Sequence, residues 1–538
     1  MDFINFNSME SIQKLIVIIL TWLFSILPTS PTLCFGLDQQ INQEFMPFAL
    51  WWEGFILSEL FGIPVVLIVL ISGALLFTFY FGFANIRLFF TSISVVRGKY
   101  DDLEGPVPLN QHDVKDTIKD ESHYGEVNHF QALTTAVSGT VGLGNIAMVA
   151  VAISIGGPGA TFWMIVAGIL GMSTKMVECT LGVKYRSLTS DGEVLGGPMY
   201  YLSKGLKDLN KPFLGKILSV LFALLCVGAS FGGGNAFQSN QATAQIINRF
   251  GMNSPSSGFI IGLIFAIVAG VIIIGGIKRI AKVTEKLVPL MAGIYILAAL
   301  IILTLNYDQV IPALFEIVQS AFTPKATITG GIAIVIIQGF RRAAFSNEAG
   351  AGSAAIAHSA VNTKFPASEG LVAMLEPFID TVVICTITAL VIIIFNMDNV
   401  FEYGDVINGE VLINGTERIG GVNLTSMAFD SSIPGFSYVL AIAVILFALS
   451  TMISWSYYGL QSWKFLFGQS KGSDLTYKFI FLTFTILGSS VTLDAVIKFS
   501  DAMILALVFP NMIGLFFLFP IVKKELQSYL NLIKSQSR

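Results

Sequence analysis

The chain has 538 residues, of which 54% are hydrophobic and only 12% are charged, with a mean hydropathy of +0.74. A soluble globular protein carries about 25% charged residues, so this composition excludes a soluble surface and predicts a membrane protein with many spans. The formal net charge of −4 and the lack of a basic stripe argue against nucleic-acid binding, and four widely spaced cysteines without CxxC spacing predict neither bridges nor metal ligands.

The first 36 residues pose a separate question. Lys14 precedes an apolar run from Leu15 to Leu27, which Pro28 ends. This run is shorter than the about 20 residues that cross a bilayer and is typical of a signal peptide, although no A-x-A cleavage site follows it. We predict a signal peptide over 1–36, with an uncleaved helix or an interfacial segment as the alternative.

Eleven later stretches are long and apolar enough to cross a membrane, and all should be helices because backbone polar groups in lipid must bond within their own segment. Their approximate limits are 63–86, 130–155, 160–184, 216–248, 257–277, 286–305, 328–356, 368–395, 435–463, 476–496 and 501–522. The predicted fold class is therefore an all-α polytopic membrane protein with about 11 transmembrane helices.

Positive charges predict the orientation of these helices, because Lys and Arg gather in cytoplasmic loops. If 63–86 runs from outside to inside, the outer loops contain only Arg249, Lys325, Arg418 and Lys498 of the 31 Lys and Arg residues. Lys14 precedes the N-terminal apolar run and Lys175 lies within a predicted span, so neither is assigned to a loop; the rest, Arg341 and Arg342 among them, are assigned inside. The tail 526–538 is then cytoplasmic and the acidic loop 396–434 is external.

Two glycine-dense, polar interruptions lie within predicted spans. One is Ser138-Gly-Thr-Val-Gly-Leu-Gly-Asn145, and the other runs from Gln338 to Gly352. Broken helices of this kind expose backbone N–H and C=O groups, and transporters place their substrates there; close helix packing through small residues is the alternative. The breaks occur five helices apart, which predicts an inverted five-helix repeat. The expected divisions are a leading part (37–127), a first repeat (128–306) and a second repeat (307–525).

Several polar residues in other spans are candidates for the same site. Asn235, Gln238 and Asn240 should face the interior of the bundle because they are costly in lipid. Thr451 and Trp455 are four residues apart and share one helical face, where they could close a small pocket or simply pack.

The charged residues within the membrane allow two interpretations each. Lys175 and Glu178, three apart on one helix, are predicted to pair with each other. Arg341 and Arg342 could hold a gate shut through carboxylate partners or anchor the cytoplasmic side. Glu348, Glu376 and Asp380 could be buried ends, arginine partners or gating groups.

Enzyme motifs are not found in the sequence. The histidines, His112, His123, His129 and His358, lack metal-site spacing, and there is no HExxH or P-loop motif. No enzyme activity and no cofactor are predicted.

At its two breaks the chain resembles the alanine or glycine:cation symporter family, also called sodium:alanine symporters. The matching runs are HFQALTTAVSGTVGLGNIAMVAVAISIGGPGATFW (129–163), STKMVEC (173–179), GGPMYYL (196–202), FSNEAGAGSAAIAHSA (345–360) and SWSYYG (454–459). The resemblance covers roughly 45–525 and implies the LeuT-type fold, two inverted five-helix repeats, here preceded by one extra helix. The chain departs from the family pattern at Ile337, where many relatives have arginine.

The resemblance also implies the residues of the site. Backbone amides of the first break would bind the substrate carboxylate, and the implied substrate-binding residues are Thr140, Gly142, Gly144, Asn145, Phe237, Gln238, Ile336, Thr451 and Trp455. Sodium would be bound by carbonyls of the first break and by hydroxyls of Thr140, Ser450 and Thr451.

Together these inferences predict sodium-coupled symport of alanine, glycine or both into the cell by alternating access. The alternatives are a sodium- or proton-coupled symporter of another small solute, and a channel or sensor using the same pocket. Sodium is expected over protons because hydroxyls and carbonyls outnumber carboxylates near the breaks. The expected partners are a small neutral amino acid, sodium and the lipid bilayer, and the expected location is the bacterial cytoplasmic (inner) membrane.

Overall fold

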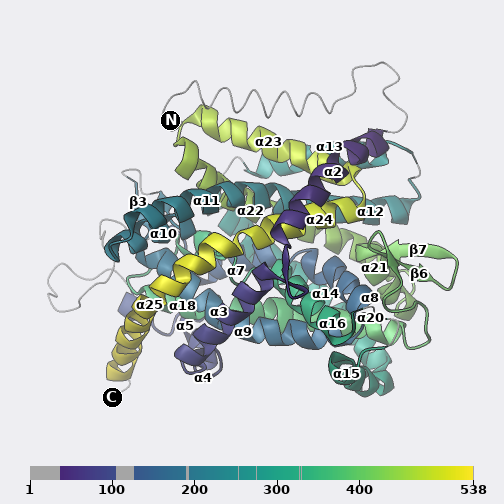
Figure 1. Ribbon diagram of the computed structural model, residues 1–538, viewed down its shortest axis with the longest axis horizontal. Coiled ribbons are helices and arrows are strands. Elements are labelled where there is room, and N and C mark those ends of the chain that lie inside the picture. The colour runs from purple at the N-terminus through teal and green to yellow at the C-terminus, as the bar shows by residue number, and fades with distance from the viewer. Residues whose placement is uncertain are drawn as a thin grey trace.

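A computed structural model describes residues 37–104, 126–189, 193–252, 254–273, 276–325, 328 and 330–536 (Figure 1). The chain is mostly helical, as predicted. The predicted signal peptide and most of the 87–127 loop lie outside the described residues.

Six helical segments in the described part of the chain are long and apolar enough to cross a membrane, or up to seven if one bent pair is counted as a span. Two shorter apolar helices, Val65–Tyr80 and Ser257–Ile273, correspond to further predicted spans. The predicted spans 328–356 and 476–496 are not among these segments. The helix in the first, Gly331–Asn347, is only 17 residues long and includes Arg341 and Arg342, and the helix in the second, Lys471–Ser490, begins with a polar, charged part. A total of eleven spans therefore stays a prediction.

The leading part contains a helix that the sequence analysis did not predict. Helix α2 (Leu37–Ile56) has a polar first half and packs against α24 (Leu493–Ala506). The remaining leading elements are β1 (Glu59–Leu60), β2 (Ile63–Pro64), α3 (Val65–Tyr80), α4 (Ala84–Arg87), α5 (Phe89–Val96) and α6 (Asp101–Glu104).

The first predicted repeat begins with a broken helix made of α7 (His129–Thr140), η1 (Gly144–Met148) and α8 (Val149–Gly156), bent by 50°. An Asn128–Gln131 capping box fixes the start of α7. The elements that follow are α9 (Gly159–Lys184), β3 (Ser187–Leu188), β4 (Val194–Leu195), α10 (Pro198–Asp208), α11 (Pro212–Phe231), η2 (Gly232–Ala236), α12 (Phe237–Phe250), α13 (Ser257–Ile273) and α14 (Gly276–Leu305).

The second predicted repeat contains the second break, between α16 (Gly331–Asn347) and α17 (Ala354–His358). Glu348, Gly350 and Gly352 have positive φ there, which ends the helix. The other elements are α15 (Tyr307–Phe322), α18 (Pro366–Ala373), α19 (Leu375–Pro377), η3 (Phe378–Cys385), α20 (Thr386–Phe395), β5 (Val406–Ile407), β6 (Glu410–Ile413), β7 (Glu417–Gly420), α21 (Gly421–Ser432), α22 (Phe436–Phe467), α23 (Lys471–Ser490), α24 and α25 (Val508–Gln536).

Two boundaries differ from the sequence analysis. The loop 396–434 forms a small antiparallel sheet in the order β5-β6-β7, followed by α21, so short strands accompany the helices. Helix α25 continues through the predicted tail to Gln536.

Segments assigned to opposite sides of the membrane gather at opposite ends of the molecule. In Figure 1 the C-terminus, α5, β3 and α10 lie toward the left, whereas β6, β7 and α21 lie toward the right. The helices with the two breaks run between these ends. This arrangement agrees with the separation of inner and outer loops that the positive charges predict.

Candidate functional site

The first break is a buried turn whose backbone is bonded by side-chain amides. The N–H of Gly142 donates to Oδ1 of Asn145 at 2.9 Å, and the N–H of Leu143 donates to Oε1 of Gln238 at 3.1 Å. Gln238 in turn donates from Nε2 to the carbonyl of Gly233 at 2.9 Å. Two N–H groups expected to bind a carboxylate thus have protein partners in this structure.

Helix α22 supplies hydroxyl groups to the same break. Thr451 donates from Oγ1 to the carbonyl of Ser138 at 3.0 Å, and Ser138 donates from Oγ to the carbonyl of Ser450 at 2.9 Å. A Cβ added at Gly142 would overlap Oγ1 of Thr451. The glycine is therefore required by the close approach of α22.

The hydroxyl groups of the three residues predicted as sodium ligands bond to different parts of the structure. Thr140 donates to carbonyls of its own helix, those of Ala136 (3.3 Å) and Val137 (3.4 Å). Ser450 donates to the carbonyl of Phe447 at 2.9 Å. Of the three, only Thr451 donates its hydroxyl from another helix to a carbonyl of α7, so the oxygens that meet between α7 and α22 are those of Ser138, Ser450 and Thr451.

Phe237 lies where the two broken helices meet. Its ring packs edge-on against Phe345, with ring centroids 5.2 Å apart. A Cβ at Gly144 would reach Phe345 and Ser346 at 3.5–3.6 Å. The structure thus places the predicted Phe237, Gln238 and Gly144 beside one another at the first break.

Trp455 belongs to the second break more than to the first. Its Nε1 donates to Oε1 of Glu348 at 2.9 Å, and its ring lies against Gly234, where a Cβ would overlap it. Ser353 donates its hydroxyl to the other oxygen of Glu348. Sequence reasoning placed Glu348 among the buried charges but did not identify Trp455 as its partner, because the pair is 107 residues apart.

Ile336 is the predicted site residue that the structure separates from the others. It is only partly buried on α16, whereas Asn145, Phe237 and Trp455 are almost fully buried. It precedes Phe345, the residue of α16 that contacts Phe237, by more than two helical turns. The described contacts therefore do not support its place at the first break.

Asn145 has a further partner that the sequence analysis missed. Its Nδ2 donates to Oδ1 of Asp380 at 2.6 Å and to the carbonyl of Asp380 at 3.0 Å. Thr381 bonds the other carboxylate oxygen at 2.7 Å, and Asn347 donates to the hydroxyl of Thr381 at 2.8 Å. Both broken helices are thus tied to η3, the first through Asp380 and the second through Thr381.

The predicted pair of Lys175 with Glu178 is wrong. Lys175 pairs with Glu376, with 3.1 Å between Nζ and Oε1. Glu178 instead accepts from the N–H of Gly350 at 3.0 Å and from Nδ2 of Asn511 at 2.7 Å. A spacing of three residues on one helix favours a Lys175–Glu178 pair. At the second break, however, Gly350 has a positive φ and its N–H group donates to Glu178 instead.

Arg342 is buried, Arg341 is partly buried, and both are paired with carboxylates, so their assignment to a cytoplasmic loop is wrong. Arg341 bonds Glu53 at 2.6 Å and Asp501 at 2.8 Å, and Arg342 lies 2.8 Å from Asp501. Both arginines line a cavity of about 380 Å³ that also touches residues of the 404–409 loop. The carboxylate pairing that a gate would need is present, on the side assigned outside.

Asn235 and Asn240 face the interior, as predicted, but they join helices instead of lining the breaks. Asn235 donates to the carbonyl of Phe481 at 2.6 Å, and Asn240 donates to the carbonyls of Gly488 and Val491 at 2.9 and 2.7 Å. Their role in this structure is to attach η2 and α12 to α23.

Comparisons with known proteins agree with the resemblance. A family model described as the sodium:alanine symporter family matches residues 51–538. The sodium/alanine symporter AgcS of Methanococcus maripaludis is 37% identical over 88% of this chain and 96% of its own. The probable sodium/glutamine symporter GlnT of Bacillus subtilis is 32% identical over 88% of this chain and 89% of its own. Among solved structures, MhsT in complex with L-phenylalanine aligns with a TM-score of 0.49 and 18% identity, over 75% of this chain and 100% of that one.

Proposed function

Because the chain belongs to the sodium:alanine symporter family, we propose that it carries a small neutral amino acid, alanine, glycine or both, into the cell together with sodium. A member of this family is a transporter and not an enzyme. The proposed place of action is the bacterial cytoplasmic membrane.

The observation that carries the proposal is the convergence at the first break. Gly142 of the break, Gln238 of α12 and Thr451 of α22 meet within hydrogen-bonding or van der Waals distance there. Amide donors suit a carboxylate, and the hydroxyl and carbonyl oxygens of Thr451 and Ser138 suit a hard cation such as sodium.

The close packing supports a small substrate. The glycines at 142 and 234 leave no room for even one methyl group beside Thr451 and Trp455. A pocket discriminates partly by exclusion, so the side chain accepted here should be small. The glutamine in the name of one relative makes a larger neutral amino acid the second candidate.

Counterflow into proteoliposomes tests the proposal. Proteoliposomes that contain the purified protein are loaded with unlabelled alanine, glycine or glutamine. Uptake of labelled alanine is then measured with sodium, lithium or protons as the only available coupling ion. We expect uptake in the presence of sodium, and we expect it to persist when the pH gradient is collapsed. Internal alanine or glycine should support faster uptake of labelled alanine than internal glutamine does. Full uptake in sodium-free buffer with a pH gradient alone contradicts sodium coupling, and stronger counterflow with glutamine contradicts the substrate.

A further inference from the structure

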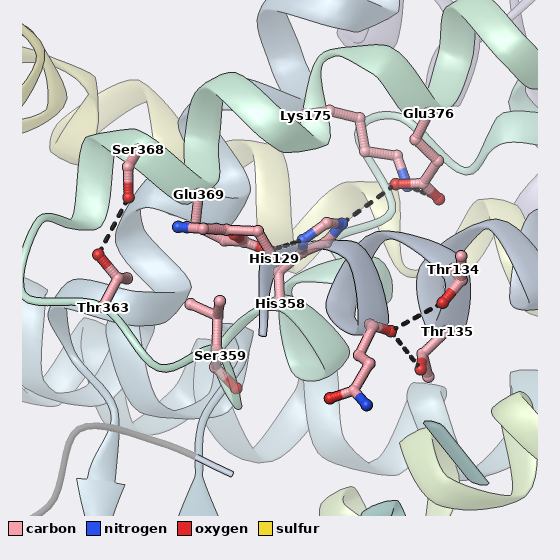
Figure 2. A network of polar contacts seen from close by, with 12 residues as sticks. His129, Thr134, Thr135, Lys175, His358, Ser359, Thr363, Ser368, Glu369 and Glu376 are labelled. Atoms are coloured by element: carbon pink, nitrogen blue, oxygen red, sulfur yellow. Dashed lines mark hydrogen bonds and ion pairs between the residues drawn. The ribbon is translucent and has the colours of Figure 1, made fainter. Parts of the chain in front are cut away.

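A chain of buried ionisable side chains connects α7 with α9 and with the helices after the second break. His129 on α7 bonds Oε2 of Glu369 on α18, and Nδ1 of His358 on α17 lies 2.5 Å from Oε1 of the same carboxylate. Nε2 of His358 is 3.6 Å from Oε2 of Glu376, whose other oxygen pairs with Lys175. Figure 2 shows His358 between the two glutamates, with the side chain of Lys175 reaching the carboxylate of Glu376.

One end of this chain reaches a pocket and the other does not. His129 lines a pocket of about 370 Å³ together with Arg97, Asp101 and Asn362. The side chains of Lys175, His358, Glu369 and Glu376 are fully buried. The pocket adjoins α5, on the side that the positive charges assign to the cytoplasm. Water can therefore exchange a proton with the chain only through the end marked by His129, among the contacts described.

The residue types alternate as proton transfer requires. An imidazole can accept a proton on one nitrogen and release one from the other, and a carboxylate can accept on one oxygen and donate again. When His129 takes up a proton on Nε2, it can release its Nδ1 proton to Glu369, so that an N–H bond breaks as an O–H bond forms. The carboxyl group then turns so that this proton faces His358, and passes it to Nδ1 of His358. His358 then releases its Nε2 proton to Glu376. The 3.6 Å gap at this last step is too long for a hydrogen bond, so the two side chains must approach before transfer.

Charge balance shows what a proton does in this arrangement. With neutral imidazoles, the positive Lys175 faces two negative carboxylates, Glu369 and Glu376. Burying an unbalanced charge is costly, and one added proton makes the chain neutral. The balance counts the neighbouring carboxyls of Glu178, Glu348 and Asp380 as protonated, because their described hydrogen-bond partners are all uncharged. Among the described residues, Cys179 and Tyr458 also face the chain, as a neutral thiol and a neutral phenol.

We propose that His129, Glu369, His358 and Glu376 form a proton-binding relay, loaded from the pocket beside His129, that holds the cytoplasmic side closed while it carries the proton. Loss of the proton leaves a buried negative charge that favours separation of α7 from α17 and α18, and with it inward opening. The proton enters and leaves from one side and is not the driving ion.

Two measurements on the full-length protein test the relay. In proteoliposomes with one protein orientation, a fixed sodium gradient and constant external pH, we expect alanine uptake to slow several-fold as the internal pH falls from 8 to 6. In detergent, we expect the Tm of the protein to fall as the pH rises over the same interval, because the proton stabilises the closed form. The second measurement needs no transport, so it remains informative even if the proposed substrate or driving ion is wrong.

Variants separate a relay from simple packing. Glu369→Gln removes the excess negative charge permanently. Uptake by this variant should be slow at every internal pH, and its Tm should not change with pH. His358→Gln should also flatten both profiles because the proton cannot pass. Ser368→Ala, next to Glu369 but outside the relay, should keep the wild-type pH profiles. Wild-type profiles that are flat in both measurements, or a Glu369→Gln protein that keeps the wild-type pH dependence, overturn the proposal.

Discussion

Individual residues at the first break were predictable because their chemistry is unusual inside a membrane. Asn145, Gln238 and Thr451 are polar residues that lipid would not tolerate, and the structure brings all three to one turn. Which residues pair was not predictable. Lys175 finds Glu376, and Trp455 finds Glu348, across 201 and 107 residues. Such partners depend on how separate helices pack, and local spacing contains no information about it.

The two glycines of the first break give a matched pair of substitutions. A methyl group at Gly142 overlaps the hydroxyl of Thr451, which is held on Ser138, whereas one at Gly144 makes ordinary contacts at 3.5–3.6 Å. Overpacking costs about 1–3 kcal/mol, which corresponds to about tenfold or more in an equilibrium. We expect Gly142→Ala to lower sodium-driven uptake at least tenfold and Gly144→Ala to lower it by a clearly smaller factor. Initial uptake rates, normalised to folded protein, check this, and equal losses would contradict the packing described.

Whole helices were predictable where apolar length or a glycine-dense break marked them. Both breaks lie where the sequence places them, at 141–143 and 348–353. Helix α2 was missed because its first half is polar and its burial depends on α24. The boundary between the last two helices was also misplaced: α24 begins at Leu493, after the short turn at Val491 and Thr492, and runs through the predicted loop near residue 500. A hydropathy profile does not detect the start of a helix that is fixed by the Thr492 N-cap.

Helix α24 carries two aspartates that test the arginine cluster against a more exposed ion pair. Asp501 is fully buried between Arg341 and Arg342, whereas Asp494 pairs with Lys498 and is 20% exposed. Breaking a buried pair costs about 3–5 kcal/mol, and a surface pair contributes about 0–1 kcal/mol. We therefore expect Asp501→Asn to lower the Tm by many degrees and Asp494→Asn to change it little. Thermal unfolding of both variants in the same detergent measures this, and similar Tm values would show that Asp501 does not hold the arginines.

The molecule as a whole has its predicted inner and outer segments at opposite ends (Figure 1). The positive-charge rule could anticipate this because it counts many residues, so the two misassigned arginines did not change the outcome. The internal repeat and its exact limits stay predictions.

Labelling of single cysteines tests the orientation. Cys179, Cys226 and Cys385 are buried and should resist impermeant maleimide, and Cys34 can be replaced by serine. In that background, Asn414→Cys, exposed in the turn between β6 and β7, should be labelled in intact cells. Ser535→Cys, exposed near the end of α25, should be labelled only after the cells are opened. The reverse pattern would invert the whole assignment.

The carboxamide of Gln238 on the N–H of Leu143 has a consequence for turnover. If an amino acid carboxylate uses that donor, it must displace an internal competitor, so its affinity is the difference between two similar bonds and not the full strength of one. When the substrate leaves, the Gln238 carboxamide can accept from the N–H of Leu143 again, so this backbone donor is not left unpaired. A carrier needs release to be as easy as capture, and a built-in replacement partner lowers the barrier in both directions.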